Sequence, residues 1–136
     1  VWGTSPAGGD WLVGVEDPNR PDRDAAVFVL SDGGVATSGI SRRSWRRGRQ
    51  TVHHLIDPRT GAPARTGIQT VTVTSPTAIQ AEVATTALFV GGEADTTLAR
   101  ILPLISNAII VRETGEIREI TGHLEVRSHA SHVNVA

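Results

Sequence analysis

The sequence predicts an α+β domain with a largely antiparallel sheet and helices packed on one face of it. Three observations support this class. Aromatic residues make up only 4% of the 136 residues, so the core must consist mainly of Val, Ile, Leu and Ala, whose β-branched members favour strands. Short apolar runs separated by turn residues fill the first half of the chain. One clearly helical stretch follows a strand in the second half.

The first expected strands lie before residue 40. Trp11–Glu16 is a short apolar strand that ends before Asp17. Ala25–Leu30 and Val35–Gly39 are both strand-like, and the turn residues of Ser31–Gly34 lie between them. This pattern predicts that the two strands pair as a hairpin.

The middle of the chain alternates loops and strands. Ser41–Gln50 contains five arginines and no acidic residue, which is typical of an exposed segment. Thr51–Ile56 is a short strand that enters the loop Asp57–Pro63, rich in Pro and Gly. Thr and Val alternate over Thr70–Thr74, which predicts a strand buried on one face.

Two helices are expected next. Ser75–Gly91 has Ser75 as the predicted N-cap, Pro76 at the first helical position and a glycine pair at its end. A second helix is expected over Glu93–Ile101, with Pro103 near its end.

The C-terminal part predicts a second hairpin, in which Asn107–Arg112 and Glu116–Ile120 flank a turn. The tail from residue 122 to 136 is weakly patterned, and we expect irregular or edge structure there. Its three histidines, His123, His129 and His132, have no Cys or carboxylate partner at a spacing typical of zinc sites. We therefore expect them to be solvent-exposed.

Composition excludes several functional classes. With a net charge of −1, the chain as a whole has no electrostatic attraction to nucleic acid or to an anionic membrane. The chain has no cysteine, so disulfides and thiol chemistry are excluded. No apolar run reaches the roughly 18 residues of a membrane span. The length of 136 residues predicts a single domain, residues 1–136. Because Met is absent as well, we expect this domain to come from a longer protein.

Two residues of the first helix are candidates for a metal site. Glu82 and Thr86 are four positions apart, so their side chains share one face of the helix. A carboxylate and a hydroxyl are hard oxygen ligands of the kind that Mg²⁺ prefers. Spacing alone favours a solvated glutamate with a threonine that bonds back to the helix.

The segment His53–Pro58 offers a candidate base. A histidine titrates near neutral pH and can take a proton from an attacking hydroxyl. Asp57 can orient the histidine or bind a polar ligand group. The same residues also fit an ordinary turn after a strand.

Two further segments can hold anions. The arginines of Ser41–Gln50 can bind phosphates, and Trp45 among them allows stacking on a base. No groove-reading motif accompanies them, so a solvated basic segment is favoured over a nucleic-acid site. The strand end at Ser38 and Gly39 can present backbone amides to an anion.

The order of these motifs is more informative than any one of them. WLVGVEDP (Trp11–Pro18), VATSG (Val35–Gly39), HHLIDPRTG (His53–Gly61) and AEVATTALFVGG (Ala81–Gly92) follow one another with a basic stretch between the second and third. Together they resemble the C-terminal half of the FAD:protein FMN transferase (ApbE-like) family. The resemblance covers residues 1–92 well and 93–115 loosely.

The resemblance implies roles for particular residues. Family members split FAD and attach FMN to a threonine hydroxyl of a target protein, releasing AMP. Glu82 and Thr86 fall on the Mg²⁺ ligands, with Glu here where Asp is usual. His54 falls on the base for the attacking hydroxyl, and Thr85 on a position that touches the flavin nucleotide.

The loop after the histidines also falls on family positions. Ile56 corresponds to backbone that contacts FAD, and Asp57 supports the loop. The resemblance implies FAD and a target protein with an acceptor threonine as partners, Mg²⁺ as cofactor and no nucleic acid. It also implies a cell-envelope location, with any lipoprotein anchor outside this segment.

Because the family builds much of its FAD pocket from an N-terminal half, we expect this chain alone to turn over little or nothing. A non-catalytic flavin-nucleotide-binding module and an FAD pyrophosphatase remain as alternatives. A nucleic-acid-binding domain that uses the arginine run is the third.

Overall fold

The computed structural model describes residues 1–123 and 128–131. Its helices are α1 (Ala78–Gly91) and α2 (Asp95–Ile101), followed by the 3₁₀ turn η1 (Leu102–Leu104). Its strands are β1 (Trp11–Glu16), β2 (Asp24–Leu30), β3 (Gly34–Gly39), β4 (Ser44–Arg47), β5 (Gln50–His53), β6 (Ile56–Asp57), β7 (Ala62–Pro63), β8 (Ile68–Ser75), β9 (Asn107–Arg112), β10 (Ile117–Thr121) and β11 (Ser128–Ser131).

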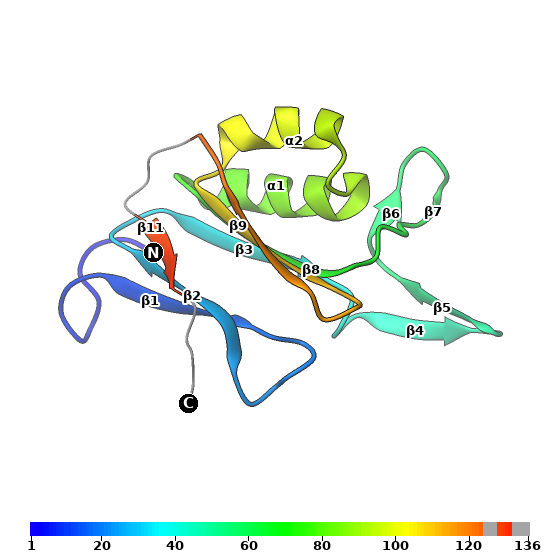
Figure 1. Ribbon diagram of the computed structural model, residues 1–136, viewed down its shortest axis with the longest axis horizontal. Coiled ribbons are helices and arrows are strands. Elements are labelled where there is room, and N and C mark those ends of the chain that lie inside the picture. The colour runs from blue at the N-terminus through cyan, green and yellow to red at the C-terminus, as the bar shows by residue number, and fades with distance from the viewer. Residues whose placement is uncertain (124–127, 132–136) are drawn as a thin grey trace.

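These elements form three layers (Figure 1). The central layer is an antiparallel sheet in the order β10-β9-β8-β3. The helices cover one face of it, and the smaller antiparallel sheet β1-β2-β11 covers the other. The expected α+β class with a largely antiparallel sheet and helices on one face is confirmed, with a second sheet added behind the first.

The central strand β8 is buried on both faces, not on one as its alternating pattern suggested. Val71 and Val73 pack in the cluster that includes Ala81 and Leu88 of α1. The threonines that alternate with them, of which Thr72 and Thr74 are almost fully buried, point the other way. The second sheet covers that face, where Phe28 packs with the β9 residues of the same side. Alternation of Thr and Val therefore marks two different buried surfaces.

The expected hairpin of β2 with β3 does not form. The strand β2 pairs with β1 and β11, whereas β3 pairs with β8 in the other sheet. The turn at Ser31–Gly33 therefore carries the chain from one layer to the next. A Cβ on Gly34 would lie 2.3 Å from the backbone nitrogen of Ala78, so β3 begins tightly against the start of α1.

The helix α1 begins two residues later than predicted. Its N-cap is Thr77, whose hydroxyl oxygen accepts the backbone N–H of Gln80 at 3.2 Å. Ser75, the expected cap, is the last residue of β8 and donates to the carbonyl of Leu104 at 2.9 Å. The predicted end is confirmed, because Gly92 caps the helix with φ at 68°.

The second half of the chain otherwise follows its sequence pattern. The β9–β10 hairpin is confirmed, and α2 ends at η1, which contains Pro103. Glu93 in the α1–α2 connection forms ion pairs with Arg112 and Arg118 of that hairpin. The weakly patterned tail contributes β11 as the edge strand beside β2. His132 lies outside the described residues.

In the described part of the chain, neither helix combines the length and the apolar character that a bilayer crossing requires.

Candidate active site

An open cavity of about 690 Å³ runs along β3, the edge strand of the central sheet. One end of β1 and the segment that follows β3 form its walls, and α1 overhangs it. The polar and charged side chains that line it come from five separate segments: Glu16, Thr37, Ser38, Ser41, Arg42, Arg43, His54, Thr70, Thr72, Glu82 and Thr86. The site is therefore assembled by the fold and not by one loop.

The helix α1 presents Glu82 and Thr86 to this cavity from its exposed face. They lie one turn apart, as the helical spacing predicted. The hydroxyl of Ser38, on the facing strand β3, lies 3.4 Å from that of Thr86. Within residues 1–123, the Glu82 carboxylate forms no ion pair, so both of its oxygens remain free to bind a cation.

A buried hydrogen-bond chain fixes this turn of the helix. Ser38 Oγ donates to Thr85 Oγ1 at 2.9 Å, and Thr85 Oγ1 donates to the carbonyl of Glu82 at 2.9 Å. Thr85 is fully buried, and Ser38 is nearly so. The hydroxyl of Thr85 is thus engaged by protein groups. Its effect on the cavity passes through the neighbouring residues Glu82 and Thr86.

The two adjacent histidines point in opposite directions, as residues at a strand end do. His53 is buried, where its Nε2 donates to the carbonyl of Ala64 at 3.0 Å and its ring meets Phe89 edge to face at 5.8 Å. His54 is exposed and lines the cavity. Its Nδ1 lies 3.4 Å from the carbonyl of Arg43. A proton on Nδ1 is therefore favoured, which leaves the Nε2 lone pair as the basic atom.

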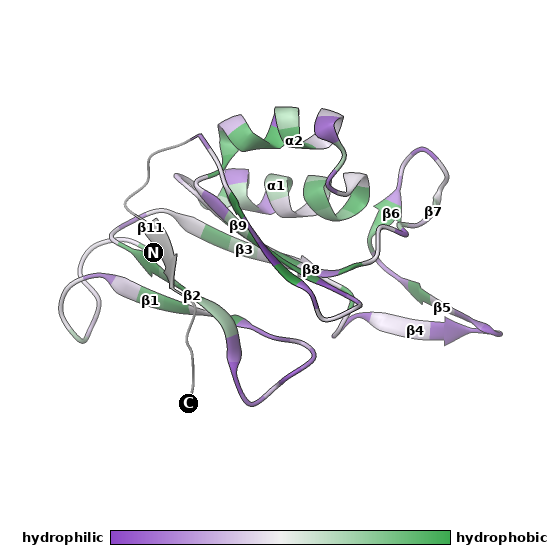
Figure 2. Cartoon of the chain, in the orientation of Figure 1, coloured by the Kyte–Doolittle hydropathy of each residue, from purple (hydrophilic) through white to green (hydrophobic). Residues whose placement is uncertain are grey.

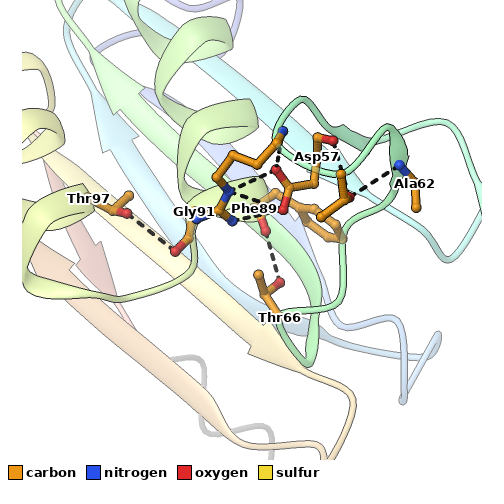
Figure 3. A network of polar contacts seen from close by, with 8 residues as sticks. Asp57, Ala62, Thr66, Phe89, Gly91 and Thr97 are labelled. Atoms are coloured by element: carbon orange, nitrogen blue, oxygen red, sulfur yellow. Dashed lines mark hydrogen bonds and ion pairs between the residues drawn. The ribbon is translucent and has the colours of Figure 1, made fainter.

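Ile56 and Asp57 do not line this cavity, although Leu55 directly before them does. Asp57 lines a second hollow of about 350 Å³ beside the C-terminal end of α1. Its carboxylate accepts the backbone N–H of Arg59 at 2.9 Å and the guanidinium at 2.8 Å (Figure 3). These hydrogen bonds hold the pKa of Asp57 below its ordinary value and raise that of Arg59. Asp57 thus shapes its own loop.

The chain that follows this loop is tied to α1 by a side-chain hydrogen bond. Thr66 Oγ1 donates to the carbonyl of Phe89 at 2.8 Å, and Thr97 of α2 donates to that of Gly91, which joins the two helices (Figure 3). Leu55, between His54 and Ile56, packs into the core below α1. These contacts fix the position of the exposed Ile56 relative to the helix.

One pair of charged residues at the mouth of the cavity was not predicted from the sequence. Glu16, at the end of β1, forms an ion pair with Arg42, which follows β3. The two residues belong to different layers, so no local pattern links them. The arginine run did point to positive charge, and Arg42 and Arg43 are the two members that line the cavity.

The donor set at Glu82 and Thr86 fits Mg²⁺. This ion commonly takes one or two protein oxygen ligands and fills its other positions with water or substrate phosphate oxygens. Throughout the described residues, no three His, Cys, Asp or Glu side chains gather as a metal cluster. A site that shares Mg²⁺ with a phosphate-bearing substrate needs no such cluster.

Comparisons with known proteins show which family this chain resembles. Residues 1–105 match the ApbE family. The FAD:protein FMN transferase of Treponema pallidum is 34% identical over 115 residues, which cover 83% of this chain and 32% of the relative. That of Salmonella typhimurium is 37% identical over 93 residues, 66% of this chain and 26% of the relative.

Solved structures show the same fold. The ApbE protein of Thermotoga maritima superposes with a TM-score of 0.73 at 34% identity, and the match covers 85% of this chain and 38% of the Thermotoga chain. The Pseudomonas stutzeri flavinyl transferase ApbE gives a TM-score of 0.63 at 28% identity, over 88% of this chain and 37% of its own. The chain spans about a third of the length of these relatives. It belongs to the ApbE family.

Proposed function

We propose that the protein containing this chain transfers FMN from FAD to a threonine hydroxyl of a target protein, with Mg²⁺ as cofactor and AMP as the other product. One observation carries the proposal: Glu82 and Thr86 of α1 line the same cavity as His54, which lies between β5 and β6. The names of the relatives from Treponema pallidum and Salmonella typhimurium, FAD:protein FMN transferase, support the reaction class.

Glu82 and Thr86 are the proposed metal ligands. Mg²⁺ held there would supply positive charge to the pyrophosphate of FAD and to the departing AMP. The chain's own contribution is to hold the two oxygens in place, through the bonds of Ser38 and Thr85 that fix this turn of α1. Thr85 thereby holds in place the part of α1 that faces the proposed flavin-nucleotide site.

His54 is the proposed base. Its Nε2 accepts the proton of the target threonine hydroxyl as the threonine oxygen attacks the phosphorus of the FMN half. The bond between that phosphorus and the bridging oxygen breaks, and AMP leaves with the electron pair. The carbonyl of Arg43 near Nδ1 orients the ring for this role.

Two further groups complete the proposed site. The backbone at Ile56 contacts FAD, and the Asp57–Arg59 contact keeps that loop in shape. The guanidinium of Arg42, now paired with Glu16, lies at the cavity mouth where an anionic substrate enters. The positive charge of this guanidinium favours binding of the negatively charged pyrophosphate.

AMP release from FAD, measured together with covalent flavin on a threonine-containing target domain, tests this function. The whole protein and its Glu82→Gln and His54→Ala variants are compared in the presence of Mg²⁺. We expect both products from the unaltered protein and neither from the variants. AMP without flavinylation would show that water is the acceptor. FAD binding without AMP release would show a binding module instead of an enzyme.

A further inference from the structure

The β4–β5 hairpin is a basic projection on an otherwise acidic chain. Residues 41–50 contain five arginines and no acidic residue, which leaves eight arginines and all fourteen acidic residues in the rest of the sequence. All ten of these residues are exposed. The hairpin extends from the body on the side away from the N-terminus and β1 (Figure 1), and its strands are mostly polar (Figure 2). It is the region of highest positive charge density.

The outer arginines of this hairpin have no acidic partner. Among the described residues, none of Arg46, Arg47 and Arg49 forms an ion pair, whereas Arg42 at the root pairs with Glu16. Trp45, opposite Val52 in the ladder, leaves 54% of its surface exposed between these charges. An exposed tryptophan flanked by unpaired arginines is typical of a protein-binding surface.

The hairpin is continuous with the candidate active site. Arg42 and Arg43, which lead into β4, line the cavity, and His54 directly follows β5. A chain that lies along the hairpin is therefore guided toward His54. Any acceptor threonine must approach this same opening.

We propose that the β4–β5 hairpin binds an acidic segment of the acceptor protein, next to the threonine that enters the cavity. The proposal rests on the proposed function, since that reaction requires an acceptor. Exposed arginines attract acidic residues with modest energy each, and their main effect is on the rate and orientation of encounter. Trp45 adds apolar contact area beside the charges.

Two other polyanionic partners fit the geometry less well. A membrane-inserting hairpin places apolar residues at its tip, but here Gly48 at the turn lies between Arg47 and Arg49. A nucleic acid that passes beyond the hairpin meets a body with more acidic than basic residues. A short acidic peptide contacts the hairpin alone.

Binding of a labelled synthetic peptide tests the proposal without any turnover. The peptide carries one threonine flanked by aspartates, and a matched peptide carries asparagines instead. The protein is compared with an Arg46→Gln, Arg47→Gln double variant. A double variant of exposed arginines elsewhere, Arg65→Gln with Arg100→Gln, has the same net charge and serves as the control. Fluorescence anisotropy at low and at moderate salt gives the affinities.

We expect the aspartate peptide to bind the unaltered protein and the control equally, and the hairpin variant about fivefold more weakly at low salt. Salt should reduce this difference. Equal binding to both double variants, or equal binding of the aspartate and asparagine peptides, overturns the proposal. So does hairpin-dependent binding of anionic phospholipid vesicles or of a single-stranded oligonucleotide without hairpin-dependent peptide binding.

Failure of the proposed function is recognised separately. If the peptide binds through the hairpin but FAD is never split by the whole protein, docking stands and the transferase reaction fails. If FMN is transferred equally well by the hairpin variant to acidic and neutral acceptors, the reaction stands and docking fails.

Discussion

Ser38 Oγ donates a 2.9 Å hydrogen bond to Thr85 Oγ1, and this contact joins the edge strand β3 to the turn of α1 that carries both proposed metal ligands. Both side chains are buried, so the bond between them is largely shielded from solvent. Thr85 in turn donates to the carbonyl of Glu82. The positions of the Glu82 and Thr86 side chains are thus set from the sheet below them.

Ser38→Ala should therefore weaken both stability and Mg²⁺ binding. Losing one buried hydrogen bond costs about 1 kcal/mol of unfolding free energy, which a denaturant titration measures. Mg²⁺ affinity in the presence of FAD, measured by calorimetry, should fall because the helix turn is less firmly held. Ser75→Ala is the control, since that buried hydroxyl donates to the carbonyl of Leu104 and does not line the cavity. Unchanged Mg²⁺ affinity in Ser38→Ala would contradict a positioning role.

Replacing Glu82 separates its charge from its size. Glu82→Gln keeps the shape but removes the negative charge, so the Mg²⁺ concentration needed for FAD binding should rise roughly ten- to a hundredfold. Glu82→Asp keeps the charge on a shorter side chain and should retain most of the affinity. Glu119→Gln, at an exposed position on β10, is the control. Equal Mg²⁺ requirements in the Gln and unaltered proteins would remove Glu82 from the site.

The two histidines should have opposite effects when changed to alanine. His53→Ala removes a buried ring that contacts Phe89 and bonds to Ala64, so it should destabilise the fold by about 2–3 kcal/mol. His54→Ala removes an exposed side chain and should change stability by less than about 0.5 kcal/mol. It should instead slow FMN transfer by about 10²–10⁴-fold. Thermal melts and transfer rates distinguish the two; normal transfer by His54→Ala would exclude it as the base.

Much of the fold was predictable because its signals are local. Strand and helix positions follow from apolar periodicity and turn residues, and the β9–β10 hairpin has its turn directly between its strands. The partner of β3 was not predictable, because a turn shows that the chain reverses but not which layer it enters. Likewise, Thr77 rather than Ser75 caps α1 because β8 runs on through Ser75. That extension depends on pairing with a distant strand.

In the candidate site too, local geometry was predictable from the sequence and long-range contacts were not. Glu82 and Thr86 are four positions apart, so helical geometry alone predicts that they share a face. Their approach to His54 depends on three layers packing together, and only the resemblance to a family anticipated it. The Glu16–Arg42 pair joins residues 26 positions apart. The sequence contains no pattern that relates them.

Arg59→Gln should raise the pKa of Asp57 toward its ordinary value. The guanidinium and backbone N–H of Arg59 favour the charged carboxylate, and this lowers the pKa of Asp57 in the folded protein. A carboxylate with a lowered folded pKa adds stability above its unfolded pKa and loses it as the pH falls through the folded value. The loop should therefore loosen only under acidic conditions, below about pH 4.

Carbon-13 NMR of the Asp57 carboxyl across this pH range measures the effect. In Arg59→Gln the midpoint should move to higher pH, while in the control Arg65→Gln it should stay where it is in the unaltered protein. Added salt should raise the midpoint of the unaltered protein slightly, since the Arg59 side chain of the pair is 71% exposed. If the Asp57 midpoint is the same in the Arg59→Gln and unaltered proteins, the ion pair does not hold this loop. The position of Ile56 must then be fixed by the Thr66–Phe89 contact instead.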